Sequence, residues 1–308
     1  MTVSGSSRRV LFIFLDGVGI GKADPAVNPF FSTPLKTLPS ILGGNLPDLD
    51  NPRYQSNHVT LVPIDANLGV EGLPQSGTGQ TSLLTGVNAA QYIGKHFGPY
   101  PFSSLKPILR ETSIYTKLEE QGKSVMYANA FPHQFFDHMK SKRARIAATT
   151  FSWISSGHTL NSAEDLAKGN ALSSDITNEG WKTRLGYPDM PLLTAREAGK
   201  LLARISRSYD FVLYEYYLTD HAGHERSFSL AGASLLKLDS LLEGILQEID
   251  LSSTLVLLTS DHGNMEDLST KSHTRNPVPF LAIGAGNKII ERAQSLTDVY
   301  SIIVEYLK

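Results

Sequence analysis

The sequence predicts an α/β protein with a mainly parallel sheet, helices on both faces of that sheet, and a small inserted cap. Short apolar runs alternate along the chain with longer stretches of helical period. Such alternation is typical of parallel sheets, because each crossover helix packs on a face of the sheet. In addition, an aspartate follows three of the apolar runs, and the carboxyl ends of parallel strands are where α/β proteins bind ligands.

The strands are predicted from short apolar runs that end at turn residues. They are expected at residues 10–15, 59–64, 124–128, 211–217, 254–259 and 279–283. Helices are expected at residues 112–120, 194–206, 230–249 and 297–307. The third of these helices repeats leucine on one face, which predicts a stripe packed into the core. The members of that stripe are Leu235, Leu238, Leu242 and Leu246.

The middle of the chain is irregular, and this divides the protein into two predicted parts. Residues 131–193 lack a sustained period, so we expect a small inserted cap there. Residues 1–130 and 194–308 then form the catalytic core. The basic run at residues 140–145 faces either a phosphate-bearing substrate or solvent, and solvent is the commoner fate of such charges.

Composition indicates a globular protein and excludes several kinds of chemistry. The chain has 308 residues, of which 41% are hydrophobic and 19% charged, with a net charge of −2. This charge gives no reason to expect nucleic acid as a partner. The absence of cysteine excludes disulfides and thiolate metal sites. No apolar stretch approaches the ~18 residues of a membrane span, so we expect no membrane contact and a cytoplasmic location.

Metal-binding side chains gather near the carboxyl end of the sequence. Asp261 and His262 follow the run at residues 254–259, and His273 comes one short loop later. A carboxylate with two imidazoles is a ligand set that zinc or manganese accepts. Upstream, Asp220 follows the run at residues 211–217 and His224 stands four residues later, a spacing that suits one helical turn or a tight loop.

A third aspartate, Asp16, ends the first predicted strand. Taken alone, an aspartate after a strand is commonly a turn residue or a helix cap. Three such aspartates at one edge of a sheet, together with three histidines, instead predict a metal centre.

These motifs resemble the alkaline phosphatase superfamily, and within it the branch of cofactor-independent phosphoglycerate mutases and phosphopentomutases. The resemblance is carried by Asp16-Gly17, by Asp220 with Gly223-His224, by residues 261–264, and by residues 272–279. It implies two divalent metal ions beside a serine or threonine nucleophile. One ion would be bound by Asp220, His224 and His273. The other would be bound by Asp16, Thr81, Asp261 and His262.

The mixed carboxylate and imidazole ligands favour Mn²⁺ or Zn²⁺ over magnesium or calcium, which prefer oxygen. The nucleophile is expected in the glycine-rich stretch at residues 72–86. Matching the family's pattern places it at Thr81, after Gln80, where we also expect a helix to begin. The fallback hydroxyls are Ser82, Thr78 and Ser76. The alternative is that this stretch is only a glycine-rich turn capped by a hydroxyl.

Further residues are assigned weaker roles. Gln80, Lys95 and Arg275 are candidate substrate contacts, and Asn264 and Glu266 are expected to orient metal ligands by hydrogen bonding. The Gly-His that follows the nucleophile in the family is missing at Leu84-Thr85-Gly86.

The resemblance and the site chemistry together predict a two-metal phosphoryl-transfer enzyme. We expect it to act on a small phosphate ester through a phosphothreonine intermediate, as a phosphomonoesterase. A phosphomutase acting on a sugar phosphate or phosphoglycerate is the second reading, and a phosphodiesterase the third. A protein that binds metal or phosphate without catalysis remains the alternative outside enzymes.

Overall fold

The computed structural model describes residues 8–141 and 143–308. Its strands form one seven-stranded sheet in the order β2-β3-β7-β6-β1-β5-β4. The bounds of the strands are Arg9–Leu15 for β1, Tyr54–Gln55 for β2, Val59–Ile64 for β3, Val125–Tyr127 for β4, Phe211–Tyr216 for β5, Thr254–Ser260 for β6 and Val278–Ile283 for β7.

The sheet is mainly parallel, as the sequence predicts. Strands β4, β5, β1 and β6 run side by side in the same direction. Strand β7 is antiparallel to β6, and β3 is antiparallel to β7. The central strand β1 places Leu15 level with Tyr216 of β5 and with Ser260 of β6. The residues that follow these three strands therefore emerge at one edge of the sheet.

Fourteen α-helices and one 3-10 helix accompany the sheet in the described residues. The helices before the cap region are α1 (Pro29–Ser32), α2 (Thr37–Ile41), α3 (Ser76–Thr85), α4 (Ala89–Ile93), α5 (Leu105–Thr112) and α6 (Ile114–Glu120). Those of the middle region are α7 (His133–Met139), α8 (Ala148–Ser155), α9 (Ala163–Ala167) and α10 (Glu179–Thr183). The remainder are α11 (Ala195–Ser206), α12 (Leu218–Glu225), α13 (Phe228–Glu248), η1 (Asn287–Arg292) and α14 (Leu296–Tyr306).

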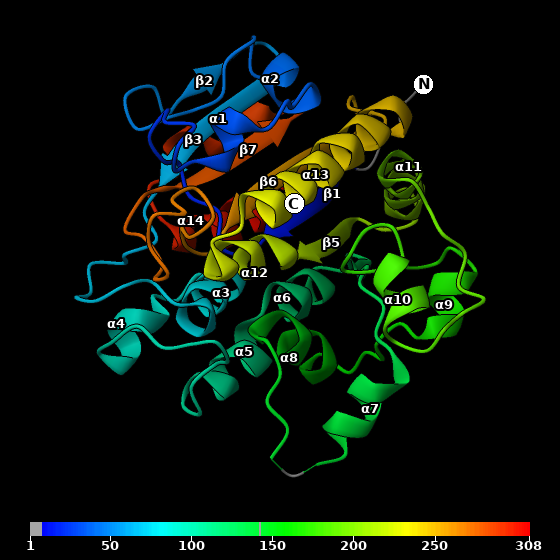
Figure 1. Ribbon diagram of the computed structural model, residues 1–308. Coiled ribbons are helices and arrows are strands. Elements are labelled where there is room, and N and C mark those ends of the chain that lie inside the picture. Colours follow the sequence, from blue (N-terminus) through cyan, green and yellow to red (C-terminus); the bar gives the residue numbers. More distant parts are fainter. Residues whose placement is uncertain (1–7, 142) are drawn as a thin grey trace, which may run out of the picture.

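Helices cover both faces of the sheet (Figure 1). Alternate residues of β1 point to opposite faces, since side chains along a strand alternate with a period of two. Phe12 and Phe14 enter the core layer beneath α3, α6 and α14, whereas Leu11 and Ile13 enter the layer beneath α11 and α13. The predicted leucine stripe of α13 is confirmed as core of this second layer.

The middle region divides between two hydrophobic clusters. Helix α8 packs with the main core, where Trp153 meets the ring of Tyr115 edge-on at 5.1 Å between centroids. Trp181 of α10 instead belongs to a separate small cluster with Leu166 and Met190. The boundaries at residues 131 and 193 stay a prediction. Within residues 8–141 and 143–308, no helix combines the length and the apolar character that crossing a membrane requires.

Candidate metal centre

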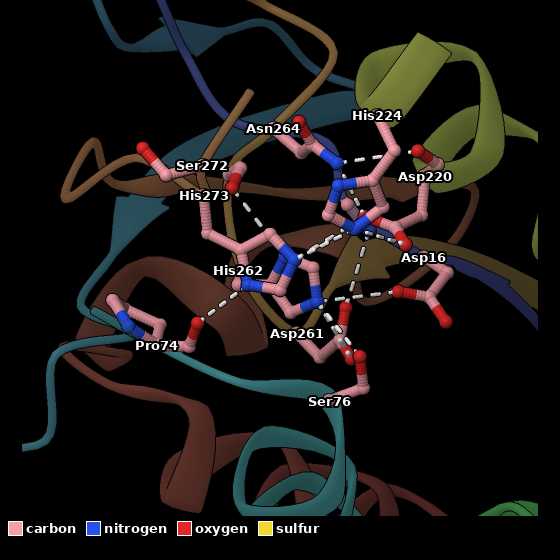
Figure 2. Close-up of polar contacts among 12 residues, drawn as sticks. Asp16, Pro74, Ser76, Asp220, His224, Asp261, His262, Asn264, Ser272 and His273 are labelled. Atoms are coloured by element: carbon pink, nitrogen blue, oxygen red, sulfur yellow. Dashed lines mark hydrogen bonds and ion pairs between the residues drawn. The ribbon is translucent and has the colours of Figure 1, made fainter. Parts of the chain in front are cut away.

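The predicted ligands meet at the carboxyl edge of the three central strands. Asp16 follows β1 directly, Asp261 follows β6 directly, and Asp220 lies in α12, which begins two residues after β5. Because the three strands are parallel neighbours, the segments leaving them converge. Figure 2 shows the side chains from all three segments pointing toward one another.

One group of ligands is built on the first turns of α12. Asp220 and His224 are separated by one helical turn, with 3.2 Å between the His224 Nε2 and the Asp220 Oδ2. His273 comes from the loop after β6, and its Nε2 lies 3.2 Å from the His224 Nε2 and 3.6 Å from the Asp220 Oδ1. The His273 Nδ1 lies 2.7 Å from the carbonyl oxygen of Pro74, and a proton on Nδ1 leaves Nε2 free to coordinate.

The second group surrounds the buried ring of His262. Its Nε2 lies 3.3 Å from the Asp16 Oδ1 and 3.7 Å from the Asp261 Oδ2. A carboxylate oxygen of Asp220 and a ring nitrogen of His273 also come within 4.8 Å of a His262 ring nitrogen. His262 therefore stands between the two groups, and its ring stacks on that of His273 at 3.8 Å between centroids (Figure 2).

The pKa shifts in the cluster indicate that its buried carboxylates favour a bound positive charge. Burial and the neighbouring Asp261 raise the pKa of Asp16 well above its ordinary value, and burial likewise raises the pKa of Asp261. Burial alone would lower the pKa of His262, but the surrounding Asp261, Asp16 and Asp220 outweigh it and raise the pKa to about 10. Burial, reinforced by His262, lowers the pKa of His273 to about 4. Crowded carboxylates that hold protons in this way favour a bound cation.

The individual ligand atoms of the cluster also suit divalent metal ions. The Asp16 Oδ1 and the Asp261 Oδ2 are buried, and neither accepts a hydrogen bond from any residue that the structure describes. Buried carboxylate oxygens without donors are costly unless a cation binds them. Three carboxylates and three imidazoles within a few ångströms are ligands that a pair of ions such as Mn²⁺ or Zn²⁺ accepts.

The helix that follows the glycine-rich stretch begins earlier than the sequence suggests. Helix α3 starts at Ser76 rather than at Thr81, so Gly77 and Gly79 lie in its first turn. A Cβ on Gly77 would meet the Tyr100 carbonyl oxygen at 2.2 Å, and one on Gly79 would meet the Asp261 carbonyl oxygen at 2.7 Å. Glycine is therefore required here by close backbone approach and not by a turn.

The earlier start of α3 changes which hydroxyl lies beside the predicted metal ligands. The Ser76 Oγ, at the first position of α3, lies 3.0 Å from the His262 Nε2. Thr81 is fully buried, and its hydroxyl donates to the Gly77 carbonyl oxygen one turn back, at 2.6 Å. The prediction that Thr81 faces the metal ligands is therefore wrong, and Ser76, a fallback in the sequence analysis, occupies that place.

The three candidate substrate contacts are placed differently. Gln80 lies at the cluster, where its Nε2 donates to the Asp16 Oδ2 at 3.2 Å, so it orients a ligand. The ammonium group of Lys95 lies over the rings of Phe97 and Phe102 at 5.9 and 5.5 Å, outside the cleft described below. Arg275 is exposed and also outside that cleft. The structure thus does not bring Lys95 or Arg275 to the site.

The expected supporting role of Asn264 is confirmed, and that of Glu266 takes another form. The Asn264 Nδ2 donates to the Asp220 Oδ1 at 2.6 Å. Glu266 binds the loop rather than a ligand: its buried carboxylate accepts from the backbone N–H of Gly19 at 2.8 Å and of Asn264 at 2.7 Å. The same carboxylate accepts from Thr274 and from the Asn276 side chain.

We expect replacement of Glu266 by alanine to destabilise the fold by at least about 3 kcal/mol, because it leaves several buried donors unpaired. The measurement is the free energy of unfolding in urea. Asp267→Ala is the matched control, since within the described residues the Asp267 carboxylate accepts only from Ser269, in a local turn. Equal losses of about 1 kcal/mol or less in both variants would contradict the role given to Glu266.

One buried carboxylate was not singled out from the sequence. Glu215 lies in β5, where its Oε2 accepts from the Tyr127 hydroxyl and from the Thr149 hydroxyl, both at 2.6 Å. Burial raises its pKa, and these two hydrogen bonds partly offset that rise. The run at residues 211–217 gave no signal for it, because one acid inside an apolar strand is not distinguished by period or spacing.

The cluster opens into a cleft of about 910 Å³. Asp16, Ser76, Gln80 and Asp220 line it on the side of the sheet edge. Residues of the middle region also line it, from α7, α10 and the segment before α8. Clefts of roughly 300–1,000 Å³ hold whole small molecules, so this one has room for more than a phosphate group.

Comparison with known families agrees with this geometry. The sequence model of the family described as "Metalloenzyme superfamily" matches residues 8–308. The chain belongs to the metalloenzyme superfamily. Curated relatives of this superfamily member include the 2,3-bisphosphoglycerate-independent phosphoglycerate mutase of Pyrococcus abyssi. The two sequences are 33% identical over 192 residues, which cover 58% of this chain and 41% of the relative. The enzyme of that name from Legionella pneumophila is 31% identical over 122 residues, 37% of this chain and 24% of the relative.

The chain therefore spans less than half the length of these curated relatives. Solved structures with a similar fold cover nearly all of it. A protein from Pyrococcus horikoshii superposes with a TM-score of 0.58 at 15% identity, covering 98% of this chain and 97% of that one. The alkaline phosphatase of the Antarctic bacterium TAB5 superposes with a TM-score of 0.56 at 12% identity, covering 98% of each chain. The predicted resemblance to the alkaline phosphatase superfamily and its mutase branch is confirmed.

Proposed function

We propose that this protein is a metal-dependent phosphomonoesterase in which Ser76 is the covalent nucleophile. The observation that carries the proposal is the Ser76 Oγ at 3.0 Å from the Nε2 of His262, which stands between the two ligand groups, together with the place of Ser76 in the lining of the cleft. No other hydroxyl of the glycine-rich stretch combines these placements. Thr78, Thr81, Ser82 and Thr85 all donate to backbone carbonyl oxygens within α3 or just before it.

The residues that would hold the ions fall into two sets, and His262 lies between them. Asp220, His224 and His273 form one set, and Asp16, Asp261 and His262 form the other, with Ser76 beside it. Divalent ions bound there would lower the pKa of the serine hydroxyl and neutralise charge on the phosphoryl group.

The chain's own groups position the substrate for in-line displacement. The phosphoryl group lies at the N-terminus of α3, where unpaired backbone N–H groups and the helix dipole favour an anion. As the Ser76 Oγ bonds to phosphorus, the ester P–O bond breaks, the serine proton is released, and the alcohol departs with the bonding electron pair and gains a proton. Water then attacks the phosphoserine, which releases inorganic phosphate and restores the serine.

A phosphomutase is the second candidate, and the relatives favour it. Both curated relatives described above are named phosphoglycerate mutases. A mutase would use the same phosphoserine, but a hydroxyl of the substrate in place of water would take up the phosphoryl group. A cleft open enough to admit water supports the hydrolytic reading.

We expect the purified protein to hydrolyse 4-nitrophenyl phosphate only when a divalent ion is bound. Treatment with a chelator should reduce the rate by at least about 10³-fold, because neither the hydroxyl nor the phosphoryl charge is then compensated. Adding back Mn²⁺, Zn²⁺ or Mg²⁺ separately identifies the ion that restores it. The product formed from a sugar phosphate decides between the two activities. A phosphatase releases free phosphate, whereas a mutase produces an isomeric ester. Bound metal without turnover of any ester would refute both.

A further inference from the structure

Two arginines of the middle region, which have no role assigned so far, line the cleft into which the metal ligands open. Arg145 precedes α8 and Arg184 follows α10, and both line the cleft that holds Ser76. Both side chains are exposed. Within the described residues, neither forms an ion pair with an acidic side chain, whereas Arg196, Arg207 and Arg292 each do.

The carboxylate of Asp175, which lies near the guanidinium of Arg184 at Gly180, is already engaged. Asp175 lines the same cleft, but its Oδ1 accepts from the Ser173 hydroxyl at 2.6 Å and from the Asn178 backbone N–H at 2.9 Å. Its Oδ2 accepts from the Gly180 backbone N–H at 2.5 Å. This carboxylate closes the turn before α10, which leaves the guanidinium of Arg184 available to an anion in the cleft.

Helix α7 ties the two arginine segments together. The His138 Nε2 lies 3.4 Å from the carbonyl oxygen of Arg145. At the other end of the helix, the Gln134 Nε2 donates to the carbonyl oxygen of Leu185 at 2.9 Å, and the His133 backbone N–H donates to the Tyr187 hydroxyl at 2.8 Å. Helix α7 therefore connects the two segments of the middle region that carry Arg145 and Arg184.

We propose that Arg145 and Arg184 form a second anion site, which selects phosphate monoesters whose alcohol part carries a carboxylate or a further phosphate. This inference rests on the proposed function, because it takes the first phosphate to lie at Ser76. Guanidinium groups bind both kinds of anion through paired, charge-assisted hydrogen bonds. The volume of the cleft leaves room for the alcohol part between the two sites.

The arginines are specificity residues and not part of the reacting site. The reacting phosphoryl group would have its own compensating charge, from the ions that the ligand cluster would hold and from the N-terminus of α3. The arginines come from two other segments, before α8 and after α10, that line the same cleft. Removing either guanidinium should therefore weaken binding of the distal anion and leave the bond-breaking step unchanged, so the effect falls on KM rather than on kcat.

The test compares matched esters with and without a second anion. Fructose 1,6-bisphosphate is paired with fructose 6-phosphate, and 3-phosphoglycerate with glycerol 3-phosphate, so the two pairs distinguish phosphate from carboxylate. We expect Arg145→Ala and Arg184→Ala each to lower kcat/KM for the preferred second-anion ester by about tenfold to a hundredfold. Turnover of 4-nitrophenyl phosphate should stay within about threefold. Arg143→Ala and Lys182→Ala remove nearby exposed charges that do not line the cleft, and should change neither.

A binding measurement separates this inference from the proposed function. Calorimetry on the metal-loaded Ser76→Ala variant measures the affinity for the same four esters and for 4-nitrophenyl phosphate without turnover, and the arginine substitutions are added to that background. Selective loss of affinity for the second-anion esters supports the site even if the reaction proves to be different. Equal losses for every ester, including 4-nitrophenyl phosphate, would place the arginines at the reacting group and overturn the inference, as would no loss at all.

Discussion

Replacing Ser76 with alanine is expected to reduce phosphoryl transfer by at least about 10³-fold, because the variant lacks the atom that bonds to phosphorus. Metal content should be retained, since the carboxylate and imidazole ligands are untouched. Rapid acid quenching of the wild-type protein with substrate, followed by mass spectrometry of its peptides, should find the phosphoryl group on the peptide containing Ser76. The Ser76→Ala variant should show no such adduct.

Thr81→Val is the matched control for that experiment. It removes the buried hydroxyl that donates to the Gly77 carbonyl oxygen and keeps the side-chain shape. We expect a loss of about 1 kcal/mol in the free energy of unfolding and activity within a few fold of the wild type. Full activity in Ser76→Ala together with an inactive Thr81→Val would restore the assignment that the sequence alone suggested.

The second large effect is expected on metal binding. His262 stands between the two ligand groups, so His262→Ala should weaken both, by more than about 100-fold in affinity. It also leaves the buried oxygens of Asp16 and Asp261 facing each other without the imidazole. His224 is half-exposed, and its Nε2 contacts Asp220 and His273, so His224→Ala should weaken one group alone.

Elemental analysis of each variant after gel filtration measures the metal bound per chain. The expected order is wild type, then His224→Ala, then His262→Ala. Circular dichroism of the same samples checks that both variants are folded. Equal metal content in the two variants would show that His262 does not serve both groups.

The strands and the ligands that follow them are the part of the structure most accessible from sequence. Residues 59–64 match β3, and the other predicted strands differ from the observed ones by one residue at one end or at both ends. Asp16, Asp220 and Asp261 could be found because each stands where an apolar run stops, and parallel neighbours bring such positions together. His224 could be found because its four-residue spacing from Asp220 suits a helical turn.

The expected start of α3 at Thr81 was wrong for a physical reason. Glycine is unfavourable inside helices, so Gly77 and Gly79 predict a loop before α3. Packing overrides that preference, because the backbone of α3 passes too close to Tyr100 and Asp261 for any side chain. Lys95 was likewise misassigned, since nothing in the sequence reveals that aromatic rings hold its ammonium group.

Because the neighbours of β1 in the sheet come late in the sequence, the centre of the sheet can form only late in synthesis. The strand occupies residues 9–15, but its neighbours in the sheet are β5 and β6, which begin at residues 211 and 254. Until the ribosome has delivered those segments, both edges of a strongly apolar strand lack their partners. Contacts of such long sequence separation form slowly, and unpaired apolar edges attract other chains. We therefore expect the nascent amino-terminal half to depend most on chaperones. The edge of the sheet that carries the predicted metal ligands can assemble only after most of the chain has emerged.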